Sequence, residues 1–271
     1  MGGNTSDIKI SRIALFGDNE GIGELLKYLP KKSVACFVCA SIRPQYFSDL
    51  RKISYTSNVP LLIQPRYTSS QYEIFFKALK SKQIDLVLCN SYSMVIRDDV
   101  LKLVDGNAVN IHYALLPKNR GPNPVQWALI KGEKETGVTM HYITNKIDAG
   151  NIVSQKKFRI EKHDSWVTLM QKCKKVAHKL MKNTIPLILN RKNTRIKQDE
   201  TEATENFRLT PEFPEIRFKG MTDLDIYNMI RAQVKPLQGA YIVLLDDKTQ
   251  YFPNMLTLSE IKKLRRKYGN W

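Results

Sequence analysis

The sequence predicts an α/β fold with a mostly parallel sheet, followed by a small C-terminal α+β subdomain. Short runs of β-branched and apolar residues alternate with helical patterns in the first half of the chain, which is the sequence form of βαβ units. A polar, charged stretch then interrupts the apolar patterning. We therefore expect a large domain at residues 10–190, a linker at residues 191–210 and a small subdomain at residues 211–271.

The expected elements of the large domain alternate in chain order. Strands are predicted at RIALF, SVACFVCA, IDLVLCN and NAVNIH, because each is a short apolar run bounded by turn residues. Helices are predicted between them at GIGELLKYL, YEIFFKALKSKQ and RDDVLKLV, and each crossover should be right-handed. A short helix at NPVQWALIKGE, strands at TGVTMHYI and NIVSQKKF, and a long helix over residues 165–189 complete the domain. Asp164 or Ser165 is the expected cap of that long helix.

The last sixty residues repeat this alternation on a smaller scale. A helix is predicted at TDLDIYNMIRAQ, a turn at KPLQG, strands at AYIVLL and TQYFPN, and a basic helix near the end. Sixty residues bury only a marginal core, so we expect this subdomain to lean on the large domain.

Composition narrows the class of protein. The chain has 271 residues, 42% hydrophobic and 25% charged, which is ordinary for a soluble globular protein. The net charge of +17 favours an anionic partner, such as nucleic acid, a nucleotide or an acidic membrane surface, without choosing among them. No run approaches the roughly 20 apolar residues of a membrane span, and the start MGGNTSDIKI lacks a secretory layout. We expect a cytoplasmic protein that does not bind a membrane.

The four cysteines are interpreted as reduced packing residues. Cys36 and Cys39 form a C-x-x-C, but an offset of three places them on opposite faces of a strand. Cys89 and Cys173 stand alone in the sequence. Neither a zinc site nor redox chemistry is therefore expected.

Polar residues in a strand-like run mark the candidate site. Asn110 and His112 are two apart in AVNIH, so their side chains share one face. Polar groups removed from water must find partners or cost roughly 1–3 kcal/mol each. A satisfied core histidine is one interpretation. The other is a functional pair at the carboxyl end of a strand, where α/β sites form, with Asp148 in a following loop to orient the imidazole.

These residue types indicate a particular chemistry. No Ser or Cys stands at a suitable turn, so covalent acyl transfer through the protein is not indicated. A His that takes the proton of an attacking amine, with an Asn amide that donates to the developing oxyanion, fits direct attack on a carbonyl. The Gly-rich FGDNEGIG after the first strand lacks the G-x-G-x-x-G spacing of a dinucleotide site, and we favour a tight strand-to-helix turn there.

The run NIHYALLPKNRGPNPVQWALIKGEKETGVTMHYITNKIDAGNIV resembles the core of the formyltransferases that use 10-formyltetrahydrofolate. Their marks are Asn-x-His, Leu-Leu-Pro-x-x-Arg-Gly, Gly-Val-Thr and Asp-x-Gly, and they occur here in order. The resemblance is close over residues 110–153 and extends over about residues 10–190. It implies a Rossmann-like formyltransferase domain.

The resemblance also implies roles for individual residues. Asn110, His112 and Asp148 would form the catalytic triad. Backbone groups of Met94, Val95 and Ile96, in the loop SYSMVI, would face the pterin of the folate cosubstrate, and no metal is implied. One departure is Ala114, where the family often has Ser. The proposed chemistry does not need that hydroxyl.

Length favours one branch of the family. Glycinamide ribonucleotide enzymes end near the long helix, and initiator methionyl-tRNA enzymes carry a larger C-terminal barrel. The tail IYNMIRAQVKPLQGAYIVL is similar to the segment that follows the catalytic domain in tRNA and sugar enzymes. The resemblance therefore implies a sugar N-formyltransferase of lipopolysaccharide or other glycan biosynthesis, acting on a dTDP-linked 3- or 4-amino-dideoxyhexose. Apart from the resemblance, three residues of the small subdomain have stacking or phosphate-binding chemistry and are candidate nucleotide ligands: Tyr227, Arg231 and Tyr251. A purely structural role is the other interpretation of these three residues.

Alternatives stay open at this point. A methionyl-tRNA formyltransferase would exploit the positive charge more fully, through counterion release. A basic RNA-binding protein on a degenerate enzyme fold is a third hypothesis. The intact triad and the lack of an aromatic-rich basic motif argue against it, so we do not expect a nucleic-acid partner. A homodimer is common in the family, but no stretch of the sequence identifies its interface.

Overall fold

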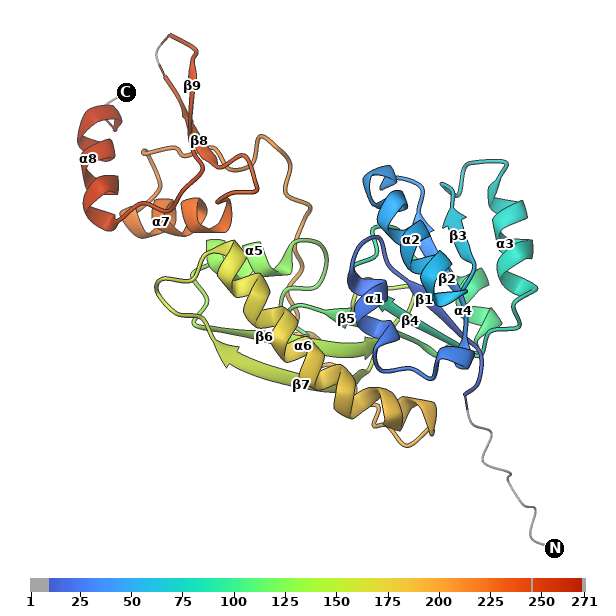
Figure 1. The fold of residues 1–271 in the computed structure, drawn as a ribbon. Coiled ribbons are helices and arrows are strands. Elements are labelled where there is room, and N and C mark those ends of the chain that lie inside the picture. Colours follow the sequence, from blue (N-terminus) through green and yellow to red (C-terminus); the bar gives the residue numbers. More distant parts are fainter. Residues whose placement is uncertain (1–9, 245, 270–271) are drawn as a thin grey trace, which may run out of the picture. The chain divides into compact units, whose positions relative to one another are not determined.

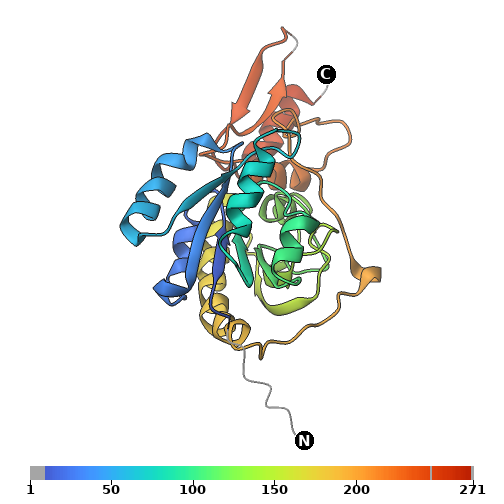
Figure 2. The same cartoon turned by 90° about the vertical axis from the view of Figure 1, so that its right-hand side faces the viewer.

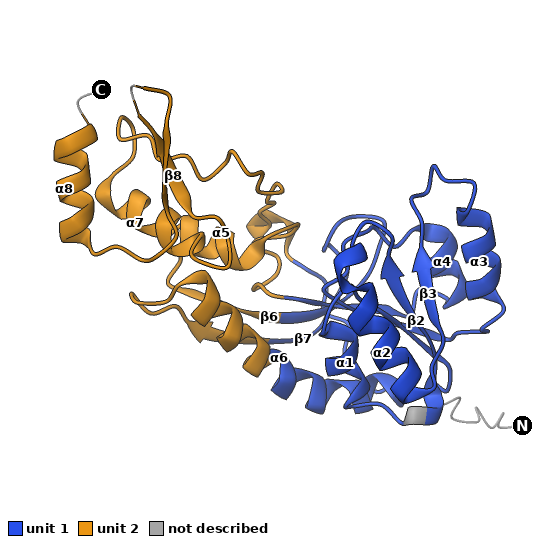
Figure 3. Cartoon of the chain, turned by 45° about the horizontal axis from the view of Figure 1, so that its top comes forward, with its two compact units in different colours: residues 1–112, 139–155, 177–198 blue, residues 113–138, 156–176, 199–271 orange. Residues whose placement is uncertain are grey.

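The computed structural model describes residues 10–244 and 246–269, and the chain divides into two compact units (Figure 3). Unit 1 consists of residues 1–112, 139–155 and 177–198, and unit 2 of residues 113–138, 156–176 and 199–271. The units interleave along the sequence, whereas the predicted domains are contiguous, and the predicted boundaries stay a prediction. Residues 1–9, on which the expectation of no secretory signal rests, lie outside the described residues.

The central sheet confirms the predicted α/β class. Its seven strands run in the order β3-β2-β1-β4-β5-β6-β7, and the first five strands of the chain pair in parallel with one another. These five are β1 (Ile13–Phe16), β2 (Val34–Ala40), β3 (Leu61–Gln64), β4 (Leu86–Asn90) and β5 (Ala108–His112). They are followed by β6 (Glu135–Tyr142), which pairs antiparallel with β5, and by β7 (Ile152–Arg159). The second, two-stranded sheet consists of β8 (Ala240–Val243) and β9 (Thr249–Phe252), an antiparallel pair.

Helices cover both faces of the parallel part of the sheet (Figures 1 and 2). One face carries α1 (Gly21–Leu26) and α2 (Phe47–Ser57), and the other carries α3 (Tyr72–Lys80) and α4 (Asp98–Leu103). Alternate residues of the strands, such as Phe16, Val38 and Val87, pack with α3 and α4 in one buried apolar cluster. Because both faces are covered, the strands are apolar on both faces, which explains their nearly continuous apolar sequences.

The turn FGDNEGIG is a tight strand-to-helix connection, as the sequence favoured. A Cβ on Gly17 or Gly21 would lie 2.7 or 2.6 Å from the carbonyl oxygen of Asn90, so only glycine fits against β4 there. Asp18 in this turn is 1% exposed and accepts backbone N–H groups from Ala40, at 2.7 Å, and from Ser93, at 2.6 Å. Its carboxylate therefore joins the carboxyl ends of three neighbouring strands.

The long helix α6 (Trp166–Leu189) begins at the predicted cap. The Ser165 hydroxyl accepts the backbone N–H of Thr168 at 3.4 Å, and Asp164 accepts the Thr168 hydroxyl at 3.0 Å. Among the residues that the structure describes, no helix is long and apolar enough to cross a membrane.

The remaining helices belong to unit 2. They are α5 (Pro124–Ile130), α7 (Asp223–Ala232) and α8 (Leu258–Tyr268), and capping boxes at Thr222 and Thr257 begin the last two. Ile226 of α7, Ile242 of β8 and Ile261 of α8 share one apolar cluster, against which Ile130 of α5 packs. The C-terminal elements thus complete their core with a helix of the predicted large domain, as expected for so short a segment.

The four cysteines are free and buried. Burial raises the pKa of Cys36, Cys39 and Cys173 to about 12 and raises the pKa of Cys89 as well. They are therefore protonated thiols that pack like small apolar side chains.

Candidate active site

Strand β5 presents the two polar residues that the sequence singled out. His112 is 6% exposed and Asn110 is half-buried, and both lie on one face because side chains alternate along a strand. In the antiparallel pairing of β5 with β6, His141 stands directly opposite Asn110, and Thr139 opposite His112. Residues opposite each other share a face, so the pairing places a second imidazole beside the first pair.

The loop after β6 holds Asp148 in place. Its φ of +50° is an unusual conformation for a residue with a side chain. The buried Gln198 amide fixes this loop by donating to the carbonyl oxygens of Asp148, at 2.8 Å, and of Gly150, at 2.7 Å. A Cβ on Gly150 would overlap the carbonyl oxygen of Tyr142. The loop is therefore clamped against β6, which explains the glycine of Asp-x-Gly.

Asp148 lies between the two imidazoles, and all four side chains belong to unit 1. Its Oδ2 is 3.5 Å from Nδ1 of His112, and its Oδ1 is 3.3 Å from Nε2 of His141. The Asn110 amide nitrogen lies 3.2 Å from the same Nε2. The three residues predicted from the sequence therefore form one cluster, and their catalytic roles stay a prediction.

His141 is a member of this cluster that the sequence did not single out. Its Nδ1 lies 2.9 Å from the carbonyl oxygen of Tyr142 and must carry a hydrogen to donate there. Nε2 then accepts from Asn110 when the ring is neutral, and donates to Asp148 when the ring is protonated. The ring is 1% exposed and stands edge-on to the ring of His112, with centroids 6.1 Å apart. One carboxylate thus stabilises a positive charge on either imidazole.

The loop predicted to bind folate begins at the same edge of the sheet. It follows β4, whose last residue Asn90 pairs with Ile111, so it starts level with His112. Besides the bond from Ser93 to Asp18, the Ser93 hydroxyl accepts from Nε of Arg43 at 2.9 Å.

The three residues predicted to face the pterin differ in burial. Met94 is half-buried, Val95 is 55% exposed and Ile96 is 4% exposed. A fixed loop with accessible backbone groups next to the cluster is suited to hold a planar heterocycle. This role of the loop stays a prediction.

The residues predicted to bind a nucleotide lie in unit 2. The Tyr227 hydroxyl donates to the carbonyl oxygen of Lys162 at 2.7 Å. Arg231 is 6% exposed, and its Nη1 donates to the carbonyls of Glu161 and Asp164, each at 3.3 Å. Burial lowers the pKa of this guanidinium. Both side chains therefore anchor the loop before α6.

Tyr251 differs from the other two predicted ligands. It is 40% exposed on β9, and its ring lies 5.5 Å from the ring of Tyr241. The nucleotide role of Tyr227, Arg231 and Tyr251 stays a prediction, with Tyr251 the most accessible of the three.

In the motif Leu-Leu-Pro-x-x-Arg-Gly, the Arg and the Gly contact other segments of the fold. Arg120 is 4% exposed and forms a two-pronged ion pair with Glu200, each N···O distance being 2.9 Å. A Cβ on Gly121, at φ +90°, would lie 2.7 Å from the carbonyl oxygen of Asn206. This loop of unit 2 therefore binds the segment after residue 198. Ala114, where the resemblance implies Ser, is fully buried.

An α/β sheet of this topology, with imidazoles and a carboxylate at the carboxyl ends of its strands, is typical of enzymes that use acid–base chemistry. Residues 11–185 match the formyl transferase model, and the chain belongs to the formyl transferase family. The chain is 32% identical over 205 residues to the methionyl-tRNA formyltransferase of Lactiplantibacillus plantarum, covering 76% of this chain and 63% of that protein. The curated relatives are longer, and the chain spans between a third and just under two thirds of their length.

Solved structures share the fold over more of their length. A 4-N formyltransferase from Francisella tularensis matches with a TM-score of 0.75 at 22% identity. The matched region covers 93% of this chain and 99% of that protein. The N-formyltransferase from Helicobacter canadensis, in complex with folinic acid and dTDP-3-aminofucose, matches with a TM-score of 0.67 at 23% identity. The matched region covers 82% of this chain and 80% of that protein. At these identities the likeness establishes the fold.

Proposed function

We propose that the protein transfers the formyl group of 10-formyltetrahydrofolate to the amine of a nucleotide-linked amino sugar, of the dTDP-linked 3- or 4-amino-dideoxyhexose class. The observation that carries the transfer chemistry is the position of Asp148 between His112 and His141, beside the Asn110 amide. No side chain in this cluster is a covalent nucleophile of the Ser or Cys type, which favours direct attack by the amine.

The reaction follows from the cluster. The amine nitrogen attacks the formyl carbon, and the carbonyl oxygen becomes an oxyanion. Asn110 has two amide N–H groups, of which one points to His141, and the other is the donor for the oxyanion. His112 accepts the proton that the amine loses, and Asp148 stabilises the resulting imidazolium. The tetrahedral intermediate then collapses, the bond from carbon to the folate nitrogen breaks, and that nitrogen takes the proton held on His112, which returns the imidazole to its neutral form.

The coverage of solved structures and the charge support the sugar branch. The sugar N-formyltransferase from Shewanella sp. is matched over 97% of its length, at a TM-score of 0.70, whereas the methionyl-tRNA enzyme is matched over 63%. The relative from Helicobacter canadensis was solved with dTDP-3-aminofucose. A net charge of +17 also attracts a dianionic diphosphate, because long-range Coulomb attraction raises its local concentration.

The test is a screen of nucleotide-linked amino sugars with 10-formyltetrahydrofolate, read by mass spectrometry of the sugar. We expect one member of the 3- or 4-amino class to gain a formyl group, and His112→Asn to abolish the gain. Formylation of none of the sugars, with folate still bound, would refute the sugar assignment.

The second candidate is formylation of charged initiator tRNA, favoured by the identity to a methionyl-tRNA enzyme. Formyl transfer to methionyl-tRNA at a rate above that for every sugar would decide for it. Tight RNA binding with a steep salt dependence and no transfer would instead indicate the non-catalytic RNA-binding hypothesis. The cytoplasmic location and the homodimer stay predictions, and size-exclusion chromatography tests the second.

A further inference from the structure

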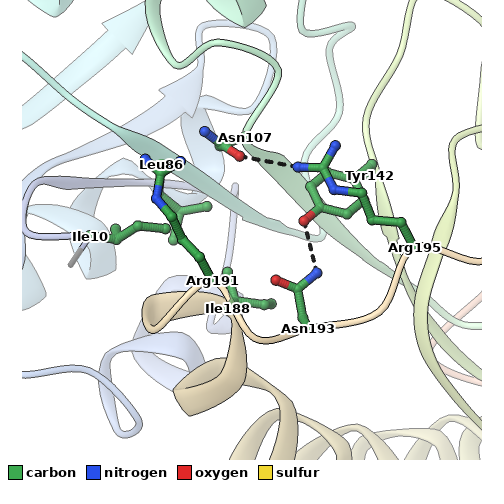
Figure 4. A pocket seen from close by; sticks show the side chains of 8 residues that line it. All are labelled: Ile10, Leu86, Asn107, Tyr142, Ile188, Arg191, Asn193 and Arg195. Carbon is green, nitrogen blue, oxygen red and sulfur yellow. Dashed lines mark hydrogen bonds between the residues drawn. The ribbon is translucent and has the colours of Figure 1, made fainter. Parts of the chain in front are cut away.

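Unit 1 contains a polar pocket at the edge of the sheet opposite the cluster of Asn110, His112 and Asp148 (Figure 4). Leu86 opens β4 and Asn107 immediately precedes β5, so the pocket lies where the parallel strands begin. His112 ends β5, five residues further along, which is about 16 Å in an extended strand. The pocket is therefore separate from the proposed transfer site.

Contacts within the pocket hold its polar groups in place. The Asn193 amide donates to the Tyr142 hydroxyl at 2.8 Å. Nη2 of Arg195 donates to Oδ1 of Asn107 at 3.3 Å, and its guanidinium carbon lies 3.9 Å from the centroid of the Tyr142 ring. The guanidinium is thus fixed by stacking and by a hydrogen bond, and this leaves most of its N–H donors for a ligand.

Arg191 adds a second guanidinium. It follows α6 at φ +54°, in the left-handed position where helices usually end on glycine. Its N–H donates to Ile188 and that of Lys192 to Leu187, which is the Schellman pattern. None of the described residues that line the pocket offers Arg191 a carboxylate, and Figure 4 shows Arg191 and Arg195 on either side of Asn107. A strained backbone therefore carries an unneutralised cation into the pocket.

We propose that this pocket binds a small phosphate-type oxyanion, either inorganic phosphate or the terminal phosphate of a small metabolite. The guanidiniums of Arg191 and Arg195, both exposed to solvent, and the Asn107 amide line the same pocket, and none of the described lining residues is acidic. The rest of the lining is mixed: Ile10, Leu86 and Ile188 are apolar, and Tyr142 and Asn193 add a hydroxyl and an amide. A volume of about 90 Å³ holds a group the size of a few waters, and not a nucleotide.

Calorimetric titration with inorganic phosphate tests this site. Since the net charge of +17 attracts any anion, each titration is compared with chloride at equal ionic strength. We expect phosphate to bind the whole protein in preference to chloride, and Arg191→Gln with Arg195→Gln to weaken binding by about tenfold or more. The matched control is Arg51→Gln, an exposed arginine on α2, which should leave the affinity unchanged.

A second double variant separates a built site from diffuse charge. Arg191→Lys with Arg195→Lys keeps both charges but loses the planar, two-pronged donors, so affinity should fall several-fold. Phosphate bound as tightly by this variant as by the natural protein, or no preference for phosphate over chloride, would overturn the proposal. Circular dichroism confirms that the variants fold. Because the titration contains neither folate nor sugar, its failure is distinct from failure of the proposed transfer.

Discussion

Replacing Asp148 by Asn tests the transfer chemistry most directly. The change removes the negative charge next to the His112 imidazole, the proposed acceptor of the amine proton, and keeps the size of the side chain. At the 3.5 Å that separates Oδ2 from Nδ1 of His112, Coulomb attraction to an imidazolium is about 1 kcal/mol in a water-like dielectric and about 5 kcal/mol at an effective dielectric of about 20. The carboxylate side chain is 14% exposed and the imidazole 7%, which favours the upper half of that range.

A loss of about 3 to 4 kcal/mol corresponds to a fall in kcat of about a hundredfold to a thousandfold. The assay is steady-state release of tetrahydrofolate with the amino sugar that the screen identifies. The control is Asp105→Asn, an exposed aspartate at φ +49°, a conformation that Asn tolerates, so its kcat should be unchanged. A kcat for Asp148→Asn within threefold of the natural enzyme would refute the charge argument, provided that Tm is unchanged.

Three further predictions concern the supports of the site and the fold. Asp18→Asn leaves one of the two backbone N–H groups bound to this side chain without its acceptor, at a cost of roughly 1–3 kcal/mol in stability. If the loop that contains Ser93 binds folate, KM for the cosubstrate should rise about tenfold while kcat stays nearly constant. An unchanged KM would contradict this role of the loop. Burial raises the pKa of Asp164, but the Lys172 ammonium at 2.7 Å and other donors outweigh it, so the pKa is lowered in the folded state. The ion pair therefore stabilises the fold at pH values above the pKa of an unfolded Asp, about 3.9, and this stabilisation is lost as pH falls through the lower pKa of the folded state. Asp164→Asn should lower Tm more at pH 7 than at pH 3. Equal losses of Tm at the two pH values would contradict the assignment. Gly150→Ala places a methyl group on a carbonyl oxygen of β6 and should cost about 2 kcal/mol or more in chemical denaturation, with an unchanged midpoint as the contrary result.

The strands were predictable because the sheet is covered on both faces. Runs such as VACFVCA and LVLCN are apolar throughout, and the structure has β2 and β4 at those positions. Two elements, α2 and β3, were not singled out. Leu50 is the one residue of α2 that is buried among those described, and β3 is only LLIQ with three of its four residues half-buried. Neither has the strong apolar pattern on which such a prediction depends.

The residues of the candidate site that could be predicted are those whose place depends on a single strand or a single loop. Alternation placed Asn110 and His112 on one face, and a motif placed Asp148 nearby. Arg231 shows what residue type alone leaves out: its nucleotide role stays a prediction, and the structure adds that its guanidinium donates to carbonyl groups of the loop before α6. Residue chemistry alone does not reveal which polar groups are already satisfied by the fold, because those contacts join segments about seventy residues apart.

His141 was missed for the same reason, since its place depends on the register between β5 and β6. That register has a chemical consequence. With a neutral ring, Nε2 accepts one N–H of Asn110, and the amide keeps its other N–H for the oxyanion. With a protonated ring, Nε2 donates to Asp148, and the amide must turn its oxygen towards Nε2, which redirects the donor. The charge of Asp148 is then shared between two imidazoles. The proposed roles of His112 and Asn110 therefore fit the arrangement in which Nε2 of His141 accepts from the Asn110 amide.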